Sequence, residues 1–63
     1  MITVHPHPSK SDRVIVTCTS SAAAWSVMRQ CDAAGLLAGM PGLLTHTVEV
    51  LGDVEQVASV VGL

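Results

Sequence analysis

The sequence has few charged residues and almost no aromatic ones. Three basic and five acidic side chains make up 13% of the 63 residues, whereas about a quarter of a typical soluble domain is charged. Trp25 is the only aromatic residue, and Phe and Tyr are absent. With a formal net charge of −2 and no aromatic set on which bases would stack, we expect no nucleic-acid partner.

Long apolar runs and cysteines are also scarce. The longest stretch without a charged residue lies between Asp32 and Glu49, and Pro41 and several glycines interrupt it, so we expect no association with a membrane. The first residues have no apolar core of the kind that a secretory signal contains, and two cysteines are too few for a disulfide framework. We therefore expect a cytoplasmic protein with free thiols.

Apolar residues, in contrast, make up 49% of the chain. A domain of this size has a large surface, a small interior and marginal stability. Part of the apolar material must then lie outside the core of a single copy, and contiguous exposed apolar surface usually marks an interaction site. The composition predicts that the chain associates with itself or binds another protein.

The pattern of apolar residues predicts a single small α+β domain over residues 1–63. Residues 1–12 are expected to form an edge strand or an extended arm, followed by a loop, because prolines exclude a central strand. The β-branched run over residues 13–18 and the alternation over residues 45–51 predict two further strands. In residues 13–18 the side chains of Val14, Val16 and Cys18 share one face of the strand.

Two helices are predicted from apolar residues at helical spacing. The first follows Ser20 or Ser21, either of which is placed to cap it, and it stops at Gly35. The second follows the cap residue Asp53 and ends at Gly62. The predicted order along the chain is strand, strand, helix, strand, helix.

The layout resembles half of a ferredoxin-type fold, with both helices on one face of a three-stranded sheet. Because a helix connects the second and third strands, we expect these two strands to be parallel and the crossover to be right-handed. The other face of the sheet, or an open strand edge, would stay bare. We expect a second copy of the chain to cover it and complete the fold.

Trp25 is the strongest single candidate for a contact residue. It lies beside Met28 and Arg29 on the flank of the first predicted helix, and Trp, Met and Arg are enriched at protein interfaces. The alternative is that Trp25 closes the edge of a core made of small aliphatic side chains. The predicted interaction residues are the helix residues Trp25, Met28 and Arg29 and the loop residues Leu36, Leu37, Leu43 and Leu44.

The turn between the second strand and the first helix offers a second kind of site. Cys18, Thr19, Ser20 and Ser21 lie where a helix N-terminus would lower the pKa of a thiol and hold an anion. However, this turn has no glycine that would let the backbone wrap a phosphate. The alternative is a buried thiol followed by a helix cap. A disulfide between Cys18 and Cys31 is a further alternative to two thiols in the core.

The three histidines do not suggest a metal site. His5, His7 and His46 would supply three imidazoles for zinc. Yet Pro6 separates the first two and directs them differently, and no cysteine or acid lies near them in sequence. We expect a solvated arm carrying His5 and His7, with His46 on a face of the sheet, and no bound metal.

The function that this sequence favours is a homo-oligomeric protein-interaction or regulatory module. No phosphate-binding glycine loop, catalytic triad order or paired carboxylates are present, so we expect no enzymatic activity and no cofactor. The abundance of Ala, Val and Gly favours a gene of high G+C content, which genomic base composition would test. One form of such a module is a viral accessory protein that acts on a partner in a bacterial host. The alternative is a small-ligand or anion-binding protein that uses a reactive thiol at residues 18–21.

Overall fold

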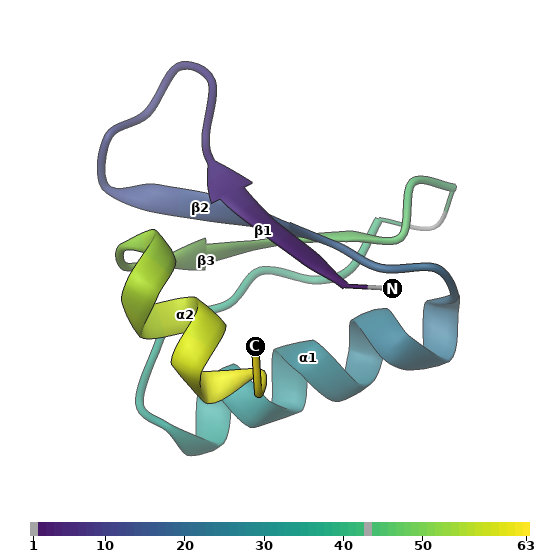
Figure 1. Ribbon diagram of the computed structural model, residues 1–63. Coiled ribbons are helices and arrows are strands. Elements are labelled where there is room, and N and C mark those ends of the chain that lie inside the picture. Colours follow the sequence, from purple (N-terminus) through teal and green to yellow (C-terminus); the bar gives the residue numbers. More distant parts are fainter. Residues whose placement is uncertain (1, 43) are drawn as a thin grey trace.

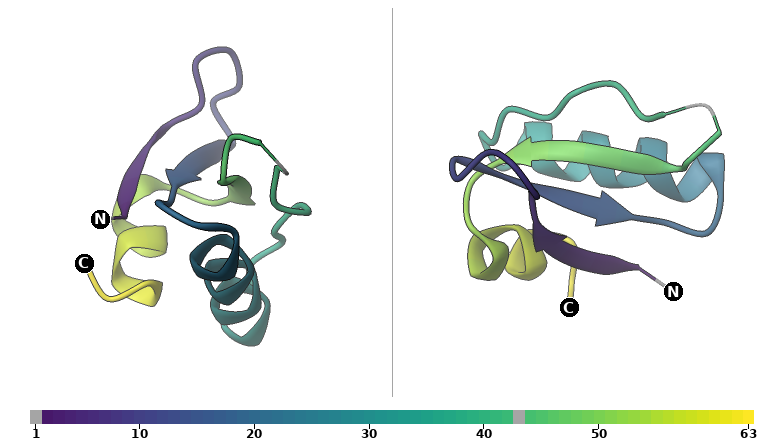
Figure 2. Two further views of the ribbon diagram at one scale, coloured as in Figure 1. Left: turned by 90° about the vertical axis from the view of Figure 1, so that its right-hand side faces the viewer. Right: turned by 90° about the horizontal axis from the view of Figure 1, so that it is seen from above.

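The computed structural model describes residues 2–42 and 44–63, which form a three-stranded sheet and two helices (Figure 1). The strands are β1 (Thr3–Pro6), β2 (Arg13–Thr17) and β3 (Thr47–Leu51), and the helices are α1 (Ser21–Ala33) and α2 (Val54–Val60). Both helices lie on the same side of the sheet (Figure 2). The α+β class, the order of the elements and the two-layer arrangement are therefore confirmed.

The strands lie in the order β1-β2-β3, and both neighbouring pairs are antiparallel. β1 and β2 form a hairpin in which Thr3 lies opposite Thr17, and Thr17 in turn lies opposite Thr47 of β3. The N-terminal residues thus form the edge strand that the sequence predicts.

The expected parallel pairing of β2 and β3 is wrong. The 13 residues of α1 span about 20 Å, which returns the chain to the end of the sheet where β2 begins. A strand that started there would run parallel to β2. Instead, residues 37–42 first run the length of the sheet along β3, so that β3 starts at the opposite end (Figure 1). The resemblance to a ferredoxin-type fold is limited to the layers.

Valine dominates the core between the sheet and the helices. The alternation that places Val14, Val16 and Cys18 on one face of β2 is confirmed, because all three are buried. Among the described residues, the buried hydrophobic side chains come from four elements and the residue after β2: Val14, Val16, Cys18, Ala24, Val27, Cys31, Val48, Val50 and Val57. None of these buried side chains is aromatic, and larger ones such as Met28 and Leu36 pack only at the margin of the core.

The predicted helix ends are also confirmed. The Oγ of Ser20 accepts a hydrogen bond from the N–H of Ala23 at 3.1 Å, and Asp53 accepts one from the N–H of Gln56 at 2.7 Å. Gly35, with φ of +82°, follows α1, and the N–H of Leu36 donates to the carbonyl of Cys31. This pair of features closes the helix as a left-handed stop with an apolar residue beyond it.

Candidate interaction surface

Residues 37–42 lie against the outer edge of β3 as an irregular fourth strand. The N–H of Leu51 donates to the carbonyl of Leu37, and the N–H of Gly39 donates to the carbonyl of Glu49, both at 2.9 Å. Ala38 forms an isolated bridge with Val50. The edge of β3 is therefore already paired. The sequence does not predict this pairing, because Gly39, Pro41 and Gly42 are typical of a loop.

Among the described residues, this stretch and the nearby Leu44 hold the most exposed large apolar side chains. We call residues 37–42 and 44 the apolar segment. Within it Leu37 is 71% exposed, Met40 76% and Leu44 94%. Leu36, one residue earlier, instead packs against the core. Of the four leucines predicted as contacts, the structure thus exposes Leu37 and Leu44 and partly buries Leu36, and Leu43 lies outside the described residues.

The helix residues predicted as contacts lie on one flank of α1. Met28 is partly buried against the core, Trp25 is partly exposed, and Arg29 is exposed. Trp25 stands one helical step, about 100°, from the buried Ala24, so its ring lies beside the core rather than within it. A contact role for this flank stays a prediction.

The outer face of the sheet is bare, as expected, and most of its side chains are polar or charged. The Nε2 of His7 lies 3.1 Å from Oε1 of Glu49, and the guanidinium of Arg13 lies 3.8 Å from the same oxygen. Arg13 also donates to Asp12 at 3.1 Å, and this hydrogen bond lowers the pKa of Asp12 below its usual value. The charges on this face are largely paired with one another.

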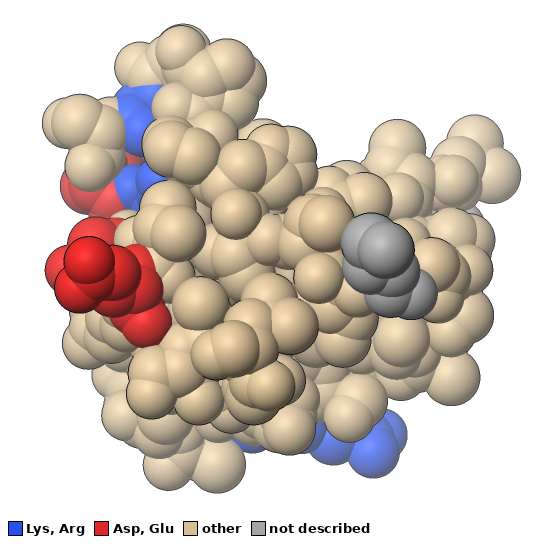
Figure 3. Space-filling model, in the orientation of Figure 1, with Lys and Arg blue, Asp and Glu red and all other residues tan. Residues whose placement is uncertain are grey.

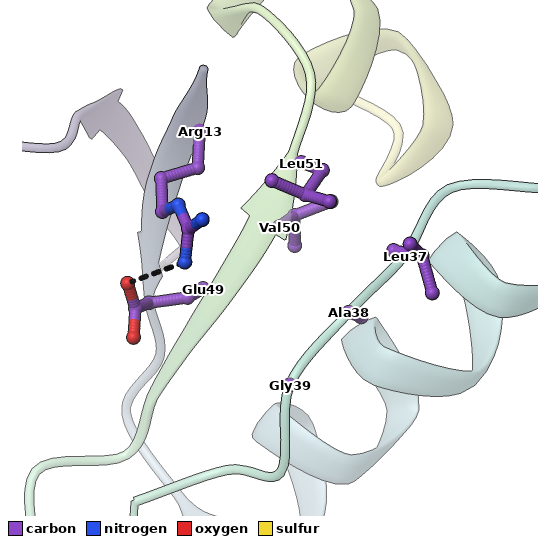
Figure 4. Close-up of a pocket in the computed structure, with 7 residues that line it drawn as sticks. All are labelled: Arg13, Leu37, Ala38, Gly39, Glu49, Val50 and Leu51. Carbon is purple, nitrogen blue, oxygen red and sulfur yellow. Dashed lines mark ion pairs between the residues drawn. The ribbon is translucent and has the colours of Figure 1, made fainter. Parts of the chain in front are cut away.

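A shallow pocket of about 210 Å³ opens between this polar face and the apolar segment (Figure 4). Arg13 and Glu49 line one side of it, and the backbone of Ala38 and Gly39 lines the other. Leu37 and Leu51 add apolar walls. Because Arg13 is already paired with two carboxylates, the pocket has no unpaired cation with which to hold an anion.

The turn at residues 18–21 is a strand end followed by a helix cap. Cys18 is only 5% exposed, and burial raises the pKa of its thiol, which is opposite to the lowering expected at a reactive helix N-terminus. The Oγ of Ser20 accepts a hydrogen bond from the N–H of Ala23, so this hydroxyl serves as the helix cap. Cys18 and Cys31 are both buried free thiols, so the disulfide alternative is wrong in this structure.

The histidines have separate partners. The Nε2 of His5 lies 3.0 Å from the hydroxyl of Thr17 on the outer face of the sheet. His46 precedes β3 at φ of +53°, and its carbonyl accepts from the N–H of Cys18. Within residues 2–42 and 44–63, no group of three His, Cys, Asp or Glu side chains is arranged to hold a metal.

His7 has a role that the sequence did not predict. Its Nδ1 accepts hydrogen bonds from the backbone N–H groups of Ser9 and Lys10, each at 3.1 Å. Since those groups can only donate, Nδ1 carries no proton and Nε2 directs its N–H at Glu49. The hydroxyl of Ser9 lies 3.3 Å from the same Nδ1. A serine, an imidazole and a carboxylate thus meet, but the lone pair that a general base would use is engaged with the turn.

No protein-family model, curated protein sequence or solved structure matches this chain. In the part of the chain that the structure describes, no helix has both the length and the apolar character needed to cross a membrane.

Proposed function

We propose that this chain is a small self-associating protein-interaction module that presents the apolar segment to another protein. The observation that supports the proposal is the exposure of Leu37, Met40 and Leu44, whose exposed fractions are 71 to 94%. The core of the single copy is formed mainly by valines and does not need these side chains. These side chains add little burial to a single copy. In contact with a partner, their apolar surface would be removed from water, and this burial is the main favourable term in protein association.

The scarcity of charge supports the same proposal. Eight ionised side chains are distributed over the surface of the molecule, and several of them are paired with one another across the outer sheet face. A face with little charge and exposed apolar side chains is a poor surface for a free monomer and a good one for a contact. We propose a cytoplasmic location, where Cys18 and Cys31 stay reduced, and a role without enzymatic activity or a cofactor.

The partner protein is proposed to be a host or regulatory target, as for a viral accessory protein. The geometry gives no support to the alternative of a thiol-dependent ligand site at residues 18–21. Burial of the Cys18 thiol raises its pKa and keeps it away from solvent.

A photo-crosslinking experiment tests the apolar segment. A photoreactive leucine analogue replaces Leu44, and the chain is activated in cells that naturally produce it. We expect one saturable adduct that unlabelled wild-type chain suppresses and that a Leu37→Ser/Met40→Ser competitor does not. Absence of an adduct, or equal suppression by both competitors, would contradict the role of the segment. The same analogue at the exposed Ala22 of α1 is the control and should give no saturable adduct.

Self-association is tested separately, by sedimentation equilibrium of the wild-type chain. We expect a mass above the 6.5 kDa of one copy at high micromolar concentration. A single species of 6.5 kDa over the whole concentration range would refute this part of the proposal.

A further inference from the structure

One edge of the sheet is covered and the other is open. The edge of β3 carries the backbone hydrogen bonds to residues 37–42. β1 pairs only with β2 within the part of the chain that the structure describes, and its other edge faces outward (Figure 2). An open edge is a template for a further strand.

The register shows which backbone groups of β1 are free. The N–H of His7 donates to the carbonyl of Arg13, so these two residues form a hydrogen-bonded pair. In an antiparallel ladder such pairs alternate, so His5 and Thr3 also direct their backbone groups at β2. Val4 then directs its N–H and its carbonyl away from the sheet.

By the same alternation, the backbone groups of Ile2 and Pro6 also point away from β2. The open edge therefore has two donors, the N–H groups of Ile2 and Val4, and three acceptors, the carbonyls of Ile2, Val4 and Pro6. Pro6 has no N–H.

We propose that two copies of the chain pair through β1 around a twofold axis at Val4, which joins their sheets into one antiparallel sheet of six strands. This inference rests on the proposed self-association and names the surface that performs it. In this register the N–H of each Val4 donates to the carbonyl of the other Val4, and the N–H of each Ile2 donates to the carbonyl of the other Pro6. Every donor of the edge finds an acceptor, and the missing donor of Pro6 leaves only the carbonyl of Ile2 to water.

The side chains of the edge permit this pairing. Exposed edges are usually protected by charged residues, but residues 2–9 contain none, and the first charged side chain is that of Lys10. On the helix side the partly buried Val4 would meet Val4 of the second copy. On the outer side the exposed Thr3 would face His5.

The surroundings of β1 add apolar surface on the same side. The C-terminal residues lie on the side of β1 and α2, and Leu63 is 64% exposed (Figures 1 and 2). The face of the molecule seen in Figure 3, with β1 and α2 toward the viewer, carries charge mainly at its margins. Pairing there would leave the two apolar segments at the far edges of the joined sheet, so that one dimer presents two copies of the segment to a partner.

Backbone N-methylation of Val4 tests the pairing in a chemically synthesised full chain. The change removes the central donor and places a methyl group at the edge, whereas the bonds between β1 and β2 do not use this N–H. We expect the dimer mass to fall to 6.5 kDa with an unchanged circular dichroism spectrum. The matched control is N-methylation of Ala38, whose N–H faces away from β3 at the opposite edge, and it should leave the dimer intact.

A disulfide trap tests the register. Thr3 and His5 of the second copy would form a pair without hydrogen bonds, with Cα atoms about 4.5 Å apart, which is close enough for a disulfide. A mixture of the Thr3→Cys and His5→Cys chains should therefore give a cross-linked heterodimer on oxidation, and Thr3→Cys alone should not. The native cysteines are buried and should not compete.

The outcomes separate this inference from the proposed function. A wild-type chain that stays monomeric refutes self-association and the pairing together. A wild-type dimer that survives N-methylation of Val4, or that N-methylation of Ala38 disrupts instead, overturns the pairing through β1 and leaves self-association standing. A cross-link between two Thr3→Cys chains would overturn the register at Val4.

Discussion

Replacement of Val16 by alanine should remove a large part of the stability of this protein. Val16 is fully buried at the centre of the sheet, between Val4 of β1 and Val48 of β3. The loss of two buried methyl groups lowers the free energy of unfolding by about 1.6 kcal/mol, at roughly 0.8 kcal/mol each. The cavity left among rigid neighbours brings the total to about 2–3 kcal/mol. A chain of 63 residues is expected to have about 3–9 kcal/mol in all.

Urea unfolding, followed by circular dichroism and by the fluorescence of Trp25, measures this loss. The protein concentration must be held fixed, because association contributes to the apparent stability. Val60→Ala is the matched control, since Val60 is only partly buried on α2 and alanine favours a helix. We expect the control to change the free energy of unfolding by less than about 1 kcal/mol. Equal losses in the two variants would refute the conclusion that the valine core carries the stability.

Three further predictions concern local features. Ser20→Ala removes the acceptor for the N–H of Ala23 and should cost about 1 kcal/mol in urea unfolding, and no loss would show that the cap is unimportant. Gly35→Ala forces a side chain into φ of +82° and should cost about 1–2 kcal/mol, whereas Gly39→Ala, which meets only a carbonyl at 3.8 Å, should cost clearly less. Burial raises the pKa values of both cysteine thiols above their ordinary 9.0, so the unfolded chain loses these protons first. The free energy of unfolding should therefore fall as the pH rises above about 9, and a double cysteine-to-alanine variant that falls equally would contradict this cause.

The position of the candidate surface could be predicted from sequence only in part. The leucines after α1 are an apolar group next to glycine and proline, and that pattern alone indicates a loop with apolar side chains. Whether a given leucine packs inward depends on the closing turn at Gly35, which directs Leu36 at the core and leaves Leu37 exposed. The contact between His7 and Glu49 joins residues that are far apart in sequence, so no local pattern indicates it.

The sequence by itself determined the elements, their order and the inward faces. Alternation in β2 and β3, helical spacing in α1 and the cap residues Ser20 and Asp53 act over a few residues, where sterics and local hydrogen bonds decide the conformation. Only the tertiary structure decided that β3 runs antiparallel to β2. That direction depends on backbone hydrogen bonds between residues 37–42 and β3, and backbone groups are the same in every residue except proline, so they leave no pattern in the sequence.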